Sequence, residues 1–143
     1  MRFFLDTNIL VDLLLRRDPH LQAAVALLDL SIEEDITYFI SSHCIATTHY
    51  VCKKAISETE LRKLLAEILD LVNVVSIDEE ILRKSLKSHH RDLEDAIQIF
   101  CAHQIKRLDG IITRNLRDFS TSEISVFSPD EALRYIKNKI ETS

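Results

Sequence analysis

The sequence predicts one α/β domain built around a mainly parallel sheet, and two features of the chain support this prediction. Short apolar runs suited to buried strands alternate with longer segments whose apolar residues recur with a helical period. Strands that alternate with helices are joined by right-handed crossovers, which make the strands parallel and cover both faces of the sheet with helices. The length of 143 residues fits a single domain over residues 1–143.

Five strands are predicted, each as a short apolar run between helical segments. In chain order they occupy residues 2–5, 36–40, 73–77, 110–113 and 124–127. Helices are predicted at residues 8–15, 20–34, 41–54, 57–72, 79–86, 89–107 and 130–140. Ser41 or Ser42 can cap the third helix, Ser57 and Glu60 form a capping-box pattern at the start of the fourth, and Pro129 precedes the last.

The composition excludes several classes of function. The chain has one glycine, Gly110, whereas Walker loops and GxGxxG dinucleotide fingerprints need several, and no GxSxG nucleophile elbow is present. The net charge of −5 does not indicate nucleic-acid binding by itself. It does not exclude a nuclease, because bound cations and a local basic rim can bring phosphate to an acidic site.

No membrane segment is predicted, and the cysteines indicate a reducing compartment. Asp6 and Asp12 interrupt the apolar N-terminal stretch well before the roughly 18 residues that a membrane-spanning helix needs. Three cysteines without CxxC spacing are typical of reduced thiols in a cytoplasmic protein. The His and Cys residues of the segment 43–52 share one predicted helix and do not converge on a tetrahedral zinc site.

The segment "DLEDAIQIF" (92–100) places three acids at the front of a helix that is otherwise apolar almost all round. Two interpretations are open. Asp92 can be an N-cap, with Glu94 and Asp95 interacting favourably with the helix dipole. Alternatively, the acids belong to a cation site, which requires other acids to reach the same place, because a carboxylate beside apolar residues is costly without a partner.

Such acids follow two of the predicted strands. Asp6 comes directly after strand 2–5, and Asn115 and Asp118 follow strand 110–113, so they share the carboxyl edge where open α/β sheets bind ligands. Asp92 and Asp95, three residues apart, lie on one helix face. Oxygen ligands without His or Cys favour Mg²⁺ or Mn²⁺. An aspartyl phosphatase also has an acid after its first strand, but it would need a second acid two residues later, at Asn8.

Three motifs in this order resemble the PIN-domain ribonucleases, in particular the VapC-like toxin branch: "FLDTNILVDLL", "DLEDAIQ" and "IITRNLRDF" followed by "SEISVFSPDEAL". The resemblance covers essentially the whole chain. It implies a five-stranded parallel sheet of order 3-2-1-4-5, flanked by helices on both faces, and an acidic pocket that binds Mg²⁺ or Mn²⁺. It further implies endoribonuclease activity on RNA, restraint by an antitoxin protein, and a homodimer.

Matched residue by residue, the resemblance assigns the catalytic and metal-binding carboxylates to Asp6, Asp95 and Asp118, with Asp92 as a further metal ligand. The supporting or substrate-binding residues that it implies are Asn8, Thr113, Arg114, Asn115 and Thr47. RNA binding would use basic residues around the pocket, among them Arg16, Arg17, Lys53 and Lys54. Arg114 is equally compatible with a phosphate contact and with a structural role.

The chain departs from the family at Thr47. Relatives commonly carry an acid about seven residues past the second strand, but no acid occurs between Ser41 and Lys54. A hydroxyl can hold a water but brings no charge, which puts a second metal in question. This departure supports the alternative that the chain is a catalytically weakened PIN-fold module that binds protein or RNA.

Overall fold

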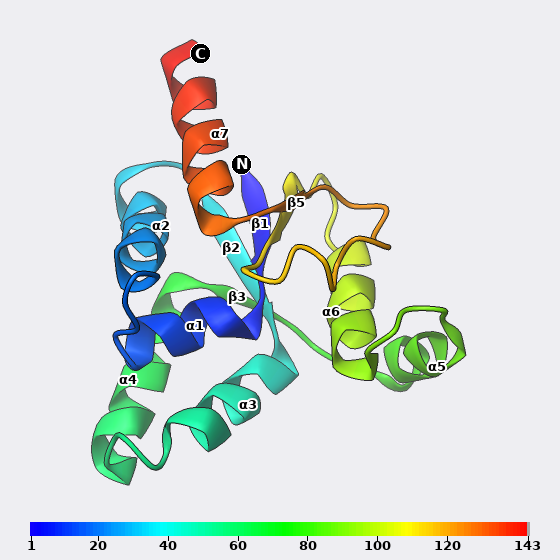
Figure 1. Ribbon diagram of the computed structural model, residues 1–143, viewed down its shortest axis with the longest axis horizontal. Coiled ribbons are helices and arrows are strands. Elements are labelled where there is room, and N and C mark those ends of the chain that lie inside the picture. The colour runs from blue at the N-terminus through cyan, green and yellow to red at the C-terminus, as the bar shows by residue number, and fades with distance from the viewer. Residues whose placement is uncertain (143) are drawn as a thin grey trace.

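One parallel sheet forms the centre of the molecule in the computed structural model, which describes residues 1–142 (Figure 1). Its strand order is β3-β2-β1-β4-β5, and every neighbouring pair is parallel. The strands are β1 (Arg2–Leu5), β2 (Thr37–Ser41), β3 (Asn73–Val75), β4 (Gly110–Ile112) and β5 (Val126–Phe127). The strand order that the resemblance implied is therefore confirmed.

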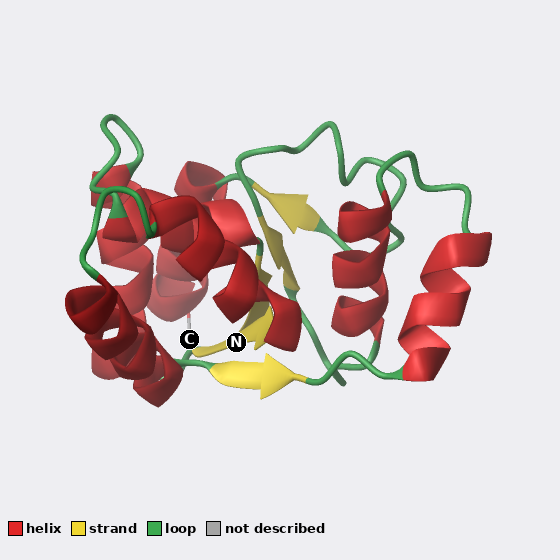
Figure 2. Cartoon of the chain, turned by 90° about the horizontal axis from the view of Figure 1, so that it is seen from below, coloured by secondary structure: helices red, strands yellow, loops and turns green. Residues whose placement is uncertain are grey.

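Helices cover both faces of this sheet. They are α1 (Thr7–Leu14), α2 (Leu21–Glu33), α3 (Ser42–Cys52), α4 (Glu58–Leu71), α5 (Glu79–Lys87), α6 (Leu93–His103) and α7 (Pro129–Thr142). Figure 2 shows the strands between two helix layers, with α5 and α6 alone on one side. In residues 1–142, no helix is both long and apolar enough to span a membrane.

The central strand β1 alternates its side chains between two separate cores. Phe3 and Leu5 pack in the core on the side of α2 and α7, whereas Phe4 packs with Ile99 of α6. This alternation follows from the period of two in a strand, and because both faces are buried, β1 reads as an unbroken apolar run. The three cysteines are free and buried.

Helices α2 and α4 bury only part of their apolar residues within the chain. Leu27 of α2 and Leu61 of α4 are fully buried in the cores of the monomer. Ile32, at 70% exposure, and Leu69, at 44%, remain at the surface. The homodimer therefore stays a prediction.

Helix α6 is shorter than the predicted segment 89–107 at both ends. Asp92 is its N-cap, because its side chain accepts a hydrogen bond from the Asp95 N–H at 3.0 Å, and so the helix begins at Leu93. The chain leaves helical conformation after His103 and passes through a left-handed residue, Arg107 (φ 58°). This turn brings the following residues back beside β1, where Asp109 accepts a hydrogen bond from the Arg2 N–H at 2.8 Å.

The single glycine begins β4 for a steric reason. A Cβ at Gly110 would lie 2.5 Å from the Phe127 ring and 2.9 Å from the Ser125 carbonyl oxygen. Only a residue without a side chain allows β4 and β5 to approach this closely. Gly110 therefore helps to place the end of β4 beside β1.

Candidate active site at the carboxyl edge of the sheet

The candidate site lies where the winding of the sheet reverses. After β1 the chain adds β2 and β3 on one side, and it later adds β4 and β5 on the other. Leu5 of β1 pairs with Ile112 of β4, and the Asp6 N–H donates to the Ile112 carbonyl at 3.0 Å. Asp6 and Thr113, the residues that follow these strands, are therefore neighbours at the position where open α/β sheets bind ligands.

Asp6 is buried, at 4% exposure, inside a shell of hydrogen-bond donors. Its Oδ2 accepts from Thr113 Oγ1 at 2.7 Å and from Asn8 Nδ2 at 3.0 Å, and its Oδ1 accepts from Gln98 Nε2 at 2.9 Å. Burial raises the pKa of Asp6, and the donors from Thr113 and Gln98 offset part of this rise. The carboxylate is held in one orientation from three segments of the chain.

Asp95 lies in the first turn of α6 and faces several like charges. Burial raises its pKa to about 7, and the charges of Asp92, Asp6, Asp118 and, least, Glu94 contribute to the rise. Carboxylates from three distant segments of the sequence therefore interact at this edge of the sheet. A cation would relieve this repulsion.

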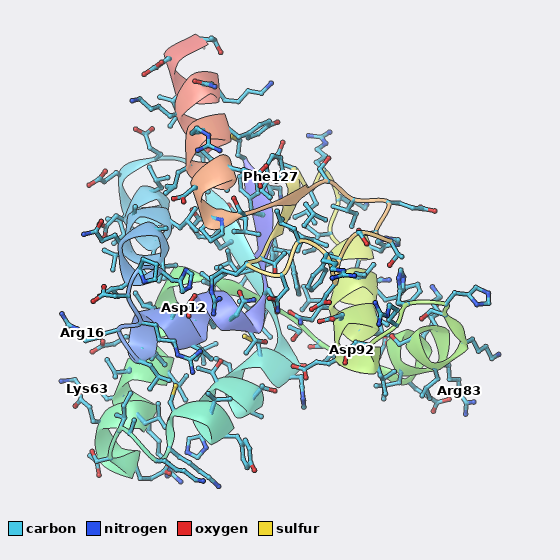
Figure 3. All side chains as sticks on the ribbon, in the orientation of Figure 1. Asp12, Arg16, Lys63, Arg83, Asp92 and Phe127 are labelled. Atoms are coloured by element: carbon cyan, nitrogen blue, oxygen red, sulfur yellow. The ribbon has the colours of Figure 1, made fainter. Side chains whose placement is uncertain are left out.

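Two adjoining cavities open over these acids, and Asp95 lines both. One, of about 440 Å³, is lined by Arg91, Asp92, Asp95, Arg117 and Asp118. The other, of about 260 Å³, has Asp6, Asn8, Asp95, Gln98 and Asn115 in its wall. We call the two cavities together the acidic pocket. Figure 3 shows Asp92 at the start of α6, where it lines the first of the two cavities.

The donor atoms of the acidic pocket suit a hard cation. They are carboxylate, amide and hydroxyl oxygens, the ligand types that Mg²⁺ and Mn²⁺ prefer. Within residues 1–142, no basic side chain forms an ion pair with Asp6, Asp95 or Asp118. No three His, Cys, Asp or Glu side chains in this range are close enough to enclose an ion by themselves. A cation held here would therefore need waters or amide oxygens besides the carboxylates, and Mg²⁺ commonly keeps several waters.

Arg114 is engaged in a structural ion pair. Its Nε and Nη2 donate to Asp12 Oδ2 and Oδ1 at 2.5 and 3.0 Å, and Asp12 is fully buried. The Arg114 N–H also faces Asn8 Oδ1 at 3.4 Å. The sequence left two roles open for Arg114, and these contacts favour the structural one. The ion pair links the segment after β4 to α1.

Two threonines that were predicted for the site, Thr113 and Thr47, lie in different surroundings. Thr113 is fully buried, and its Oγ1 accepts from the Asn115 N–H at 2.9 Å, so it links Asn115 to Asp6. Thr47, on α3, makes no hydrogen bond through its side chain within the described residues. Val51, four residues later on the same face of α3, lines the acidic pocket. Thr47 itself is not among the residues that line either cavity, so its place in the site stays a prediction.

Sequence reasoning did not find several residues of the pocket wall, among them Gln98, Arg91 and Arg117. Gln98 lies three residues after Asp95, and this spacing on one helix face was an available signal. Arg91 and Arg117 each precede an acid of the site, and neither guanidinium is ion-paired in residues 1–142. Isolated surface arginines carry no pattern that distinguishes a site residue from a solvated one.

Comparison with known families agrees with this geometry. A family model described as "PIN domain" matches residues 2–117, which is most of the chain. The chain belongs to the PIN-domain family. No curated protein sequence matches it.

Solved structures of toxin–antitoxin proteins resemble the chain over 76–90% of its length. A toxin–antitoxin complex from Klebsiella pneumoniae is similar at 27% identity and a TM-score of 0.64, over 88% of this chain and 96% of that one. VapBC2 from Rickettsia felis, bound to a promoter DNA fragment, has 16% identity and a TM-score of 0.65 over 90% and 98%. Mycobacterium tuberculosis VapC20, a toxin that cleaves the sarcin–ricin loop, has 16% identity and a TM-score of 0.58 over 76% and 86%. The last two likenesses concern the fold alone.

Proposed function

We propose that this PIN-domain protein is a Mg²⁺- or Mn²⁺-dependent endoribonuclease that hydrolyses RNA phosphodiester bonds. One observation carries the proposal: Asp6, Asp95 and Asp118 come from three distant segments and repel one another in the acidic pocket, and no basic side chain of residues 1–142 forms an ion pair with them. Such a cluster is costly to maintain unless a cation uses it. The family, which includes ribonuclease toxins, supplies the reaction class.

The side chains of the pocket would divide the work among them. A bound divalent cation supplies charge neutralisation at the phosphate and lowers the pKa of a coordinated water. Asp6 and Asp95 would hold the cation, and Asp118 and Asp92, which line the same pocket, would be further ligands. Thr113 and Asn8 keep the Asp6 carboxylate in a fixed orientation, so that little reorganisation is needed when the cation binds.

Two arginine side chains in the pocket wall could bind the phosphates of the substrate. Arg91 and Arg117 flank Asp95 and Asp118 and have no ion-pair partner within residues 1–142. RNA phosphates are repelled by a protein of net charge −5 unless such a local basic rim receives them. We infer that these two arginines contact phosphates on either side of the cleaved bond.

This inference about the rim has its own test. In the double variant Arg91→Gln/Arg117→Gln, the slope of log affinity for single-stranded RNA against log salt should fall by about 0.7 for each lost phosphate contact. Arg83→Gln is the control, because Arg83 lies on the outer side of α5, paired with Glu79 (Figure 3). An equal change in the double variant and the control contradicts the assignment.

The restraining partner is proposed by similarity. The Klebsiella pneumoniae protein complex, at 27% identity, is described as a toxin–antitoxin complex. We propose that the present chain is likewise the toxin of a type II pair and is inhibited by an antitoxin protein. Co-expression with the product of the neighbouring reading frame tests this: a complex that no longer cleaves RNA is expected.

The decisive experiment is cleavage of a circular single-stranded RNA, which only an endonuclease can open. We expect linear product with wild type and Mn²⁺, none with a chelator, and at least a hundredfold lower rate with Asp95→Asn. Glu123→Gln, the same loss of charge at an exposed position outside the acidic pocket, should retain most of the activity. Cleavage that persists in Asp95→Asn would overturn the assignment.

A PIN-fold binding module without catalysis is the second candidate, and Thr47 is the observation that favours it. At this position on α3, relatives commonly carry an acid. If wild type binds the circular RNA but never opens it with either cation, the binding module is the better account.

A further inference from the structure

The side chain of Gln98 is incompletely paired within the pocket wall. It is 3% exposed, and its Nε2 donates to Asp6 Oδ1 at 2.9 Å. Its Oε1 is buried and has no hydrogen-bond partner, the only such side-chain atom in residues 1–142. Buried polar atoms are almost always paired, and those that are not commonly mark a place for a water, an ion or a functional contact.

The orientation of this amide follows from its neighbour. A carboxylate accepts hydrogen bonds and does not donate them, so the amide must turn its NH₂ group toward Asp6. Turning the amide over would set Oε1 against a carboxylate oxygen and leave two acceptors facing each other. The Oε1 atom is therefore the one left without a partner as long as Asp6 is ionised.

The position of Gln98 links the two acids of the site. It follows Asp95 by three residues on the same face of α6, and it lines the acidic pocket together with Asp6 and Asp95. Thr113 and Asn8 already occupy the other oxygen of Asp6. Gln98 is thus the one neutral side chain on α6 that contacts Asp6 and also retains a free acceptor.

We propose that Gln98 is a positioning residue for the cation: its Nε2 holds Asp6, and its Oε1 accepts a hydrogen bond from a water molecule in the hydration shell of the bound ion. This inference rests on the proposed function. Waters around a divalent cation present their hydrogens outward, and Mg²⁺ retains several of them, so a buried acceptor beside the ligands is well suited to them. Partners of this kind orient the ligands and strengthen binding.

A purely structural role would have different consequences. In that case Gln98 only fills space and caps the Asp6 carboxylate, and an apolar side chain of similar shape affects folding but not the cation. Methionine is close to glutamine in length and flexibility and removes both the donor and the acceptor. Comparing cation affinity with metal-free stability therefore separates the two roles.

The test is calorimetric titration of the full chain with MnCl₂, using wild type, Gln98→Met and Gln104→Met. Gln104 is the C-cap residue of the same helix and is exposed, so it controls for the chemical change alone. We expect Gln98→Met to bind Mn²⁺ about 10- to 100-fold more weakly, as is typical when an outer partner of a metal site is lost. Gln104→Met should bind as wild type does. Gln98→Leu, with the same expectation, replaces Gln98→Met if that variant does not fold.

The outcomes distinguish this inference from the proposed function. If wild type and Gln98→Met bind Mn²⁺ equally well, while melting of the metal-free variant is altered, the residue is structural and the inference fails. The ribonuclease proposal is then untouched. If wild type itself binds no Mn²⁺ and cleaves no RNA, the proposed function fails and the inference falls with it.

Discussion

Replacing Asp95 with Asn should stabilise the metal-free protein, and more so at higher pH. The pKa of Asp95 is raised from 3.8 to about 7, which means that the folded protein holds this proton more tightly than the unfolded chain does. The stability connected with this proton is fully present below pH 3.8 and is lost as the pH rises toward 7. Without metal, wild type should therefore lose stability between these values, and Asp95→Asn should not lose this part.

The size of the effect follows from the same shift. A rise from 3.8 to about 7 corresponds to about 4 kcal/mol as an upper bound, since each pH unit is worth 1.36 kcal/mol. Asp95 is partly open to solvent, which screens its neighbours, so we expect about 1–2 kcal/mol. For a chain of this length that corresponds to a melting temperature about 2–8 °C higher in Asp95→Asn than in wild type at pH 8.

Thermal melting with a chelator at pH 5 and pH 8 measures this difference directly. Glu123→Gln is the control, because it removes the same charge at an exposed position outside the acidic pocket. The difference in melting temperature between Asp95→Asn and wild type should widen from pH 5 to pH 8, and Glu123→Gln should show little of it. If Asp95→Asn melts below wild type at pH 8, Asp95 is a stabilising helix-start residue and the repulsion in the pocket has been misjudged.

Three further predictions concern other parts of the site. Arg114→Met leaves Asp12 buried without its main partner and should destabilise the fold by about 3 kcal/mol. This loss corresponds to a melting temperature about 6–12 °C lower. An unchanged melting temperature would show that the ion pair does not stabilise the fold. Thr47→Glu should tighten Mn²⁺ binding, measured by calorimetry, at least tenfold. The control Ala46→Glu makes the same change about 100° around α3 and should not tighten binding. Equal effects of the two substitutions would mean that Thr47 faces away from the pocket. Mg²⁺ at a hundred times its Kd should stabilise wild type by about 2.7 kcal/mol in melting experiments, and it should stabilise Asp95→Asn clearly less. Equal stabilisation of the two proteins would mean that the ion binds elsewhere.

The sequence predicted the elements and the site edge because both depend on local patterns. Apolar runs and helical periods located the strands and helices, and parallel strands bring the residues that follow them, Asp6 and Thr113, to one edge. The two interpretations of Asp92 are compatible: it caps α6 and it lines the acidic pocket.

Pairings between distant side chains could not be predicted in this way. Arg114 and Asp12 lie 102 residues apart, and Gln98 and Asp6 lie 92 residues apart. Which side chains meet over such distances depends on how helices pack on the sheet, and no local pattern fixes that. The same limit explains the end of α6: the chain must return beside β1, so the helix ends before residue 107, where the sequence analysis placed its end.

The most direct test of the central claim is to locate the cation in the protein. Crystals soaked in MnCl₂, with diffraction measured at the manganese absorption edge, show the position of the ion as an anomalous difference peak. The account predicts the strongest peak in the acidic pocket, at coordination distance from the carboxylates of Asp6 and Asp95. A pocket without a peak at saturating Mn²⁺, or an ion bound only away from these two residues, would contradict it.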